Sequence, residues 1–227
     1  GFKRLSESNL WELAPGECYF TTRNESSIVA FRIGKKAPQD AGFKIIGAHT
    51  DSPNLKLKPN SVYEKSGYLQ LGVEVYGGAL LSTWTDRDLS LAGRVIFREG
   101  LEQLKTKLIK IDKPLLRVPQ LAIHLNRQVN EKGLILNKQN HMPPIFALID
   151  GNLKDRCPLK EIVSSELDLM PEEIVGMELS LFDTQKGAFS GLNKEFIQVA
   201  RLDNLASCHA ALMALEEGNI EDEATQV

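Results

Sequence analysis

Two apolar runs of the chain resemble each other, and the long stretch between them has a different texture. The first run, FKIIGAH at 43–49, leads to Asp51, and the second, EFIQVARLD at 195–203, ends at Asp203. Nearly continuous short apolar runs are typical of strands that are buried on both faces of a sheet. The second run continues into a segment with apolar residues at helical spacing. We therefore expect two buried strands, neighbours or near neighbours in one α/β sheet, each ending in an acid-bearing turn.

The stretch between these runs consists of short segments that alternate apolar and polar residues, with Gly, Pro and charge between them. The clearest segments are LKLKP at 55–59, YLQLGVEVYGG at 68–78, LAGRVIFREG at 91–100 and KTKLIKIDKP at 105–114. This pattern is typical of antiparallel β-structure. We therefore predict an inserted β-rich domain at 59–195, flanked by the two parts of one α/β domain at 1–58 and 196–227.

Several smaller elements can be expected outside and inside this insertion. CYFTTR at 18–23 and SSIVAFRIG at 26–34 surround a turn and predict a hairpin. LKEIVSSEL at 159–167 predicts a helix. APQDAG at 37–42 is expected to be a loop, and the acidic end of the chain, 216–227, is expected to be a surface loop.

The composition argues against several classes of partner. The 227 residues carry a formal net charge of −3, so no basic surface for nucleic acid is expected. No apolar stretch approaches the roughly 20 residues of a membrane span, and the first residues lack the apolar run of a signal peptide. Cys18, Cys157 and Cys208 are scattered without CxxC spacing, which favours reduced thiols that are buried or idle. We expect a cytoplasmic protein without nucleic-acid or membrane partners.

The chemistry that the two acid-bearing turns can support is metal binding. In an α/β sheet, ligands gather beyond the carboxyl ends of the strands. His49 can bind a metal through one ring nitrogen, while Asp51 can hold the other nitrogen and fix the tautomer. Asp203 can share its two oxygens between two metals. The structural alternatives are a strand-end histidine bonded to a loop carbonyl, and an Asp203 or Asn204 that caps the following helix.

Other motifs support less. The chain contains neither a GxSxG nucleophile elbow nor a phosphate loop ending in GK[ST]. The acidic and basic residues at 86–88 favour a structural ion-pair cluster, with a role between domains as the alternative. His141 lies in a polar loop and is expected to be solvated, and His209 is expected to be packed on the helix after Asp203.

Taken together, the segments resemble the aspartyl aminopeptidase family along nearly the whole chain. The resemblance rests on IIGAHTDSPNLKLKP, YGGALLSTWTDRDLSLAGRV, RVPQLAIHLNR, ELSLFDTQ and FIQVARLDNLASCHAALMAL, in this order. It implies an intracellular dinuclear zinc exopeptidase that removes N-terminal aspartate or glutamate from peptides. It also implies an α/β zinc-peptidase domain with a mixed sheet, interrupted by a β-rich dimerisation domain, and dimers that build a dodecamer.

The resemblance gives four residues a role. His49 matches a zinc ligand, Asp51 the aspartate that orients it, and Asp203 the carboxylate that bridges both zinc ions. His124, in LAIHLNR, is similar to the histidine that reaches a neighbouring subunit's active site and supports the transition state. The residues alone favour a core or loop histidine at this position.

One departure from the family's pattern stands out. The family's catalytic base and a zinc ligand form a Glu-Glu pair that ends the strand after the Asp203 helix, and a later aspartate and histidine complete the site. Glu216 and Glu217 come directly off that helix, so they receive no role. The sequence also begins without methionine, and we expect a partial chain. A non-catalytic short form that acts as a dimerisation or scaffold subunit, and a dinuclear aminopeptidase of other specificity, stay open as alternatives.

Overall fold

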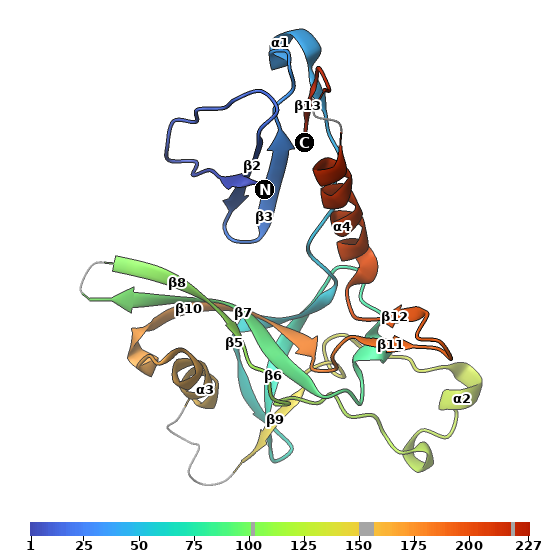
Figure 1. Ribbon diagram of the computed structural model, residues 1–227. Helices are drawn as coiled ribbons and strands as arrows, with labels where there is room; N and C mark the ends of the chain where they lie inside the picture. The colour runs from blue at the N-terminus through green and yellow to red at the C-terminus, as the bar shows by residue number, and fades with distance from the viewer. Residues whose placement is uncertain (101–102, 150–156, 219–220) are drawn as a thin grey trace. The chain divides into compact units, whose positions relative to one another are not determined.

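The computed structural model describes residues 1–100, 103–149, 157–218 and 221–227. The chain divides into two compact units (Figure 1): unit 1 is Gly1–Ser52 with Val199–Val227, and unit 2 is Pro53–Gln198. Unit 2 is contiguous in sequence and interrupts unit 1, with its ends a few residues outside the 59–195 expected for the insertion. Its role in dimerisation stays a prediction.

Unit 1 contains a five-stranded mixed sheet with the order β1-β2-β3-β13-β4. The bounds are β1 Lys3–Arg4, β2 Cys18–Arg23, β3 Ser27–Arg32, β4 Phe43–Lys44 and β13 Thr225–Gln226. The predicted hairpin is confirmed, because β2 and β3 pair antiparallel from Cys18↔Arg32 to Arg23↔Ser27. The pairs β1–β2 and β13–β4 are parallel. The α/β class with a mixed sheet, expected from the sequence, is therefore what the structure shows.

Two short elements of unit 1 correct the predicted loops. Residues Pro38–Ala41 form a helical turn, α1. The acidic end of the chain is no surface loop, because β13 lies between β3 and β4, with Thr225 only 2% exposed. The Thr225 hydroxyl accepts a hydrogen bond from the Gly34 amide at 3.2 Å. The acidic residues before this strand favour a surface loop in the sequence pattern, although Thr225 itself favours strand and is buried in the sheet.

The two apolar runs do not form the buried pair of strands that their sequence predicts. The first run gives only β4, which is an edge strand, and the following Ile45 and Ile46 are 71% and 61% exposed. The second run gives β12 Phe196–Gln198, which pairs with β11 Ala188–Ser190 in a separate two-stranded sheet of unit 2. An apolar run becomes a buried strand only where other elements cover both its faces, and the described residues do not cover these two runs.

Unit 2 is built on a six-stranded antiparallel sheet with the order β8-β7-β10-β5-β6-β9. The bounds are β5 Asn54–Lys65, β6 Tyr68–Tyr76, β7 Leu89–Glu99, β8 Gln103–Lys110, β9 Ile145–Leu148 and β10 Ile174–Asp183. The predicted antiparallel region is thus confirmed. Inward residues such as Leu55, Leu71, Leu91 and Val95 are fully buried, as period-two alternation requires.

The helices of unit 2 are short. The predicted helix is α3 Pro158–Leu167, and its Leu159 and Val163 join the buried core of the sheet. A 3-10 turn at Pro171–Glu173, η3, leads into β10, and two more turns are η1 Leu81–Trp84 and η2 Ile123–Leu125. The helical turn α2 covers Val129–Lys132. Among the described helices of the chain, none is long and apolar enough to span a membrane.

Candidate metal site

The structure brings His49 and Asp203 together in unit 1, although 153 residues separate them in sequence. Nε2 of His49 lies 3.5 Å from Oδ1 of Asp203. The histidine follows β4 in an extended segment, and the aspartate stands at the start of α4 Leu202–Glu217. Their side chains are accessible, at 53% exposed for His49 and 91% for Asp203. The side chains of His49 and Asp203 therefore converge as predicted. The two apolar runs that precede them nevertheless lie in different sheets.

The start of α4 explains why the Asp203 carboxylate is available. Arg201 has a left-handed backbone, and Asp203 and Asn204 have non-helical φ and ψ, so regular helix begins only after them. The peptide bond between Asp203 and Asn204 is cis. The Asp203 carboxylate lies beside the His49 ring, and the Asn204 amide oxygen accepts the N–H of His49, so both side chains face His49.

The ring of His49 is oriented by Asp51. Nδ1 lies 3.0 Å from the backbone carbonyl oxygen of Asp51 and 3.4 Å from its carboxylate. A nitrogen at this distance from a carbonyl oxygen carries the proton, because the carbonyl can only accept. In the neutral ring, Nε2 then presents its lone pair on the side of Asp203. The predicted orienting residue thus acts mainly through its carbonyl, which is also the alternative of a histidine bonded to a loop carbonyl.

The main chain of His49 is held by α4. Its amide N–H donates to Oδ1 of Asn204 at 3.3 Å, and its carbonyl oxygen accepts from the Cys208 thiol at 3.2 Å. The Ser52 hydroxyl donates to the carbonyl oxygen of Asp203 at 3.4 Å. Sequence reasoning missed these contacts and left Cys208 as an idle thiol. The one available signal was the spacing of four between Asn204 and Cys208, which places both on one face of a helix.

The donor set of this site is incomplete within the described residues. No group of three or more His, Cys, Asp or Glu side chains among them is arranged to hold a metal ion. Glu216 and Glu217 end α4, and regular helix from Leu205 to Glu216 spans roughly 16 Å, far beyond a shared coordination shell. Glu216 and Glu217 therefore lie too far from Asp203 to share a metal ion with it.

The remaining histidines lie elsewhere. His209 is exposed on α4, so the expectation of a packed histidine is wrong. The apolar spacing of this helix predicts a packed face, but Leu215 is the only buried residue of α4. His141 is exposed in a turn, as expected, and its Nδ1 accepts from the Asn137 amide at 3.0 Å.

His124 lies in unit 2, on η2. Its side chain is exposed, and the flanking Leu121, Ile123 and Leu125 are 65%, 46% and 73% exposed. An apolar segment presented in this way around a histidine is unusual for a surface loop and typical of a contact region. Of the two positions that the residues alone favour, the core is excluded by this exposure, and His124 lies in a connecting segment with a single 3-10 turn.

The segment that leads to His124 is held at its base by the predicted ion-pair cluster. Arg117 donates to the Asp88 carboxylate and to the Asp86 carbonyl oxygen, each at 2.8 Å. The Asp86 carboxylate accepts from the Gln120 amide at 3.2 Å. Arg87 pairs with Asp183 at 3.0 Å. The cluster at 86–88 is therefore structural, and it fixes the chain four residues before His124.

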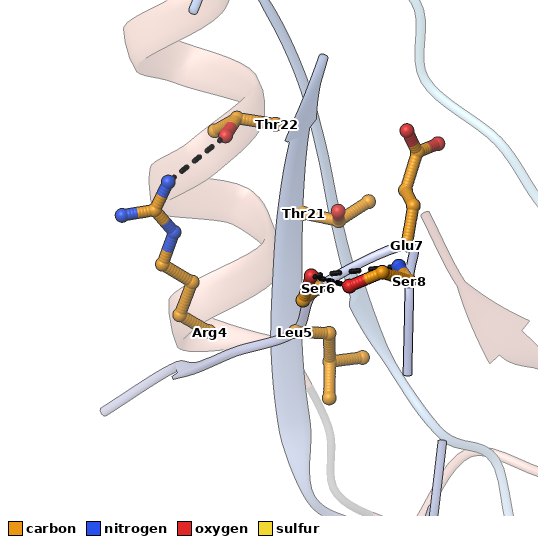
Figure 2. Close-up of a pocket in the computed structure, with 7 residues that line it drawn as sticks. All are labelled: Arg4, Leu5, Ser6, Glu7, Ser8, Thr21 and Thr22. Carbon is orange, nitrogen blue, oxygen red and sulfur yellow. Dashed lines mark hydrogen bonds between the residues drawn. The ribbon is translucent and has the colours of Figure 1, made fainter. Parts of the chain in front are cut away.

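A pocket of unit 1 is lined by residues far from these in the sequence (Figure 2). It is lined by Arg4, Leu5, Ser6, Glu7, Ser8, Thr21 and Thr22. Arg4 donates to the Thr22 hydroxyl at 3.4 Å, and the Ser6 and Ser8 hydroxyls lie 2.8 Å apart. None of the residues with a predicted role lines it.

Comparison with family models now assigns the class of protein that this fold and this site define. Residues 1–226 match the family described as Aminopeptidase I zinc metalloprotease (M18). The chain belongs to this family. The resemblance inferred from the motifs is confirmed at this level.

Individual relatives sharpen the comparison. The chain is 50% identical over 217 residues to the Probable M18 family aminopeptidase 2 of Pseudomonas paraeruginosa, covering 95% of the chain and 50% of the relative. It superposes on a chain of the structure titled Cryo-EM structure of the Ape4 and Nbr1 complex with a TM-score of 0.90, 39% identity and coverage of 100% and 47%. For the Structure of S. cerevesiae mApe1 dodecamer, the TM-score is 0.76, with 30% identity and coverage of 99% and 52%. The chain thus spans about half the length of these relatives.

Proposed function

We propose that this chain carries part of the active site of a zinc aminopeptidase, in which His49 and Asp203 bind metal. The observation that carries this is the 3.5 Å approach of Nε2 of His49 to Oδ1 of Asp203, with Nδ1 of the ring already bound at Asp51. Two electron-pair donors that face each other repel unless a cation or a proton lies between them. Both atoms are therefore placed for a positive ligand.

The spacing fits a zinc ion in particular. Two ligands about 2.1 Å from a tetrahedral zinc lie about 3.4 Å apart, close to the separation that the free side chains already have. An imidazole nitrogen and a carboxylate oxygen are both normal zinc ligands. The second oxygen of the Asp203 carboxylate is left for a second metal, which supports two zinc ions per site.

Zinc at such a site polarises a peptide carbonyl and lowers the pKa of a bound water. The side chains of this chain would bind the metal and orient its ligands. His49 and Asp203 hold their side of the site, and Asp51 fixes the ring of His49. Further ligands, the catalytic base and the pocket for an N-terminal aspartate or glutamate would come from beyond this donor set.

We extend the proposal to self-association and to the neighbouring subunit. A related structure is titled as a dodecamer, which supports dimers that build a dodecamer for this protein as well. The exposed apolar segment around His124 supports a contact through unit 2, with His124 acting on the active site of the partner subunit. Cytoplasmic location and specificity for acidic N-terminal residues rest on the resemblance to the aspartyl aminopeptidases.

Zinc binding by the 227-residue chain tests the proposal without any activity. In a zinc titration followed by the ring signals of all four histidines, the His49 signals should respond first, with the other three as internal controls. Asp203→Asn should weaken this binding by about tenfold or more, because it removes ligand charge. Glu217→Gln, at the other end of α4, is the matched control and should leave it unchanged. An equal response of all histidines, or no effect of Asp203→Asn, would contradict the proposal.

The same chain with excess zinc should not release aspartate from a peptide, because two side chains cannot hold two ions. A chimera in which the chain replaces the matched half of the Pseudomonas paraeruginosa relative should be active, with aspartate-terminal peptides preferred over leucine- and lysine-terminal ones. Saturable release by the chain alone would overturn the ligand assignment. An inactive chimera that binds zinc and self-associates would favour the scaffold alternative.

A further inference from the structure

The peptide groups on both sides of His49 are gripped by two side chains of α4. The Asn204 amide oxygen accepts the N–H of His49 at 3.3 Å, and the Cys208 thiol donates to the C=O of His49 at 3.2 Å. Asn204 and Cys208 are four residues apart and both half-buried, and His49 is the residue whose two backbone polar groups they share. A residue held at both its N–H and its C=O has little freedom left in its backbone dihedrals.

These two hydrogen bonds hold a segment, residues 45–51, that is exposed and so has little packing to fix it. The His49 side chain is 53% exposed, and the pairing of its segment with the end of the chain reaches only to Ile46, three residues earlier, whose amide donates to the Val227 carbonyl oxygen at 2.9 Å. Ile45 and Ile46, between the strand and His49, are also exposed. A ring on such a segment would sample several rotamers if only the strand held it. The hydrogen bonds from α4 tie it to the same helix whose first turn carries Asp203.

The connection is short and chemically direct. From Nε2 of His49, the path runs through the ring to the His49 main chain, then through Cys208 and Asn204 to Asp203, the sequence neighbour of Asn204. A shift of α4 therefore moves both members of the candidate metal site together. Catalytic and metal ligands need this kind of support, because a displacement of about 1 Å is enough to lose a productive geometry.

We propose that Cys208 and Asn204 are positioning residues, which fix the His49 main chain on α4 and so hold the His49 ring opposite Asp203. The inference rests on the proposed function for its purpose, but the positioning itself can be measured without metal. Cys208 is thus a hydrogen-bond donor with a geometric task, and its substitution should act through His49.

The test uses the 227-residue chain with labelled histidine and two pairs of variants. Cys208→Ala removes the donor, while Cys208→Ser keeps one at nearly the same volume as alanine. Asn204→Leu removes the acceptor, while Asn204→Asp keeps one. Thr50→Val is the matched control, because it removes a hydrogen bond of the neighbouring residue to Ser26, at 3.0 Å, without touching the His49 peptide.

Two readouts are needed. In metal-free protein, relaxation of the His49 ring carbons should show lower order in Cys208→Ala and Asn204→Leu, with recovery in Cys208→Ser and Asn204→Asp. In a zinc titration, the same two disruptive variants should raise the Kd at His49 by about tenfold, the effect typical of residues that support a metal ligand. Cys208→Ser should stay within about fivefold of the unsubstituted chain. Thr50→Val should change neither readout.

The outcomes separate the two proposals. Unchanged ring order in Cys208→Ala and Asn204→Leu overturns the positioning role, whatever zinc does. Loss of ring order without any zinc binding to the unsubstituted chain keeps the positioning role and overturns the proposed function. If a disruptive variant unfolds, Cys208→Ser decides, because serine keeps the donor at a volume close to that of alanine. The hydrogen-bond role predicts near-normal ring order in Cys208→Ser, and a purely volumetric role predicts the lower order expected of Cys208→Ala.

Discussion

The segments that carry His49 and His124 are both exposed, but they are anchored in different ways. His49 is held at the histidine itself, through its amide, its carbonyl and its ring. The segment of His124 is held at its base, where Arg117 and Gln120 bond to Asp86, and then continues with apolar residues exposed. The first arrangement suits a metal ligand whose position is fixed before the metal binds. The second suits a side chain presented to another surface.

The largest expected effect on activity comes from substituting His124 in the active chimera. A donor that meets the developing oxyanion contributes roughly a hundred- to thousand-fold in rate. His124→Ala should therefore lower kcat by about that factor while metal content, measured by elemental analysis, stays normal. His141→Ala, in the same unit, is the control and should have little effect.

Subunit mixing shows where His124 acts. If it serves the partner subunit, inactive His124→Ala and inactive Asp203→Asn chimeras should recover activity when mixed and reassembled. With free exchange in symmetric dimers, recovery should approach roughly a quarter of the unsubstituted value. No recovery, with mixing verified by mass spectrometry, would place the action of His124 within its own chain or nowhere.

A smaller effect is expected from the base of the His124 segment. Asp86→Ala removes the carboxylate that accepts the Gln120 amide, so the segment should lose its fixed direction. We expect kcat to fall by about tenfold, with KM nearly unchanged, because a misplaced donor affects the transition state more than ground-state binding. Asp112→Asn, which breaks an exposed pair with Lys110 in the same unit, should not reproduce the loss. Equal losses in the two variants would reduce the cluster to a general structural role.

The smallest effect concerns unit 1 and is visible only through pH. Hydrogen bonds from Lys44 and then Gln226 hold the pKa of the Asp222 carboxyl below its usual range. A depressed pKa contributes stability that is present above the unfolded value, about 3.9, and lost as the pH falls through the folded value. Asp222→Asn should therefore lower the Tm slightly at neutral pH and leave it unchanged in strong acid. Asp40→Asn, on α1, serves as the control, and an acid-side difference would contradict the assignment.

Much of the fold could be predicted where local pattern and tertiary environment agree. The β2–β3 hairpin, the antiparallel strands of unit 2 and the helix α3 each follow from alternation or helical spacing within a few residues. The two apolar runs differ from the prediction because burial depends on what covers a strand, and a hydrophobic pattern does not carry that information. β13 is not predicted because it has only two residues, of which Thr225 alone favours strand, and acidic residues precede it.

The candidate site divides in the same way. His49, Asp51 and Asp203 were named from residue chemistry and from the motifs around them, and the structure brings all three together. Asn204 and Cys208 could not be found by the same reasoning, because their hydrogen bonds join residues more than 150 positions apart. Such contacts depend on where a loop passes a helix, which no local pattern encodes.

The insertion of β13 between β3 and β4 has a consequence for how the molecule is made. Gln226 pairs with Arg32, so the sheet of unit 1 can be completed only after Gln226 has been synthesised. The intervening Pro53–Gln198 is contiguous, and all its sheet partners are available earlier. Contacts of long sequence separation form slowly, while domains generally fold as units during synthesis. On the ribosome, the β-rich unit is thus complete before the sheet of unit 1, and the candidate metal site of His49 and Asp203 assembles after it.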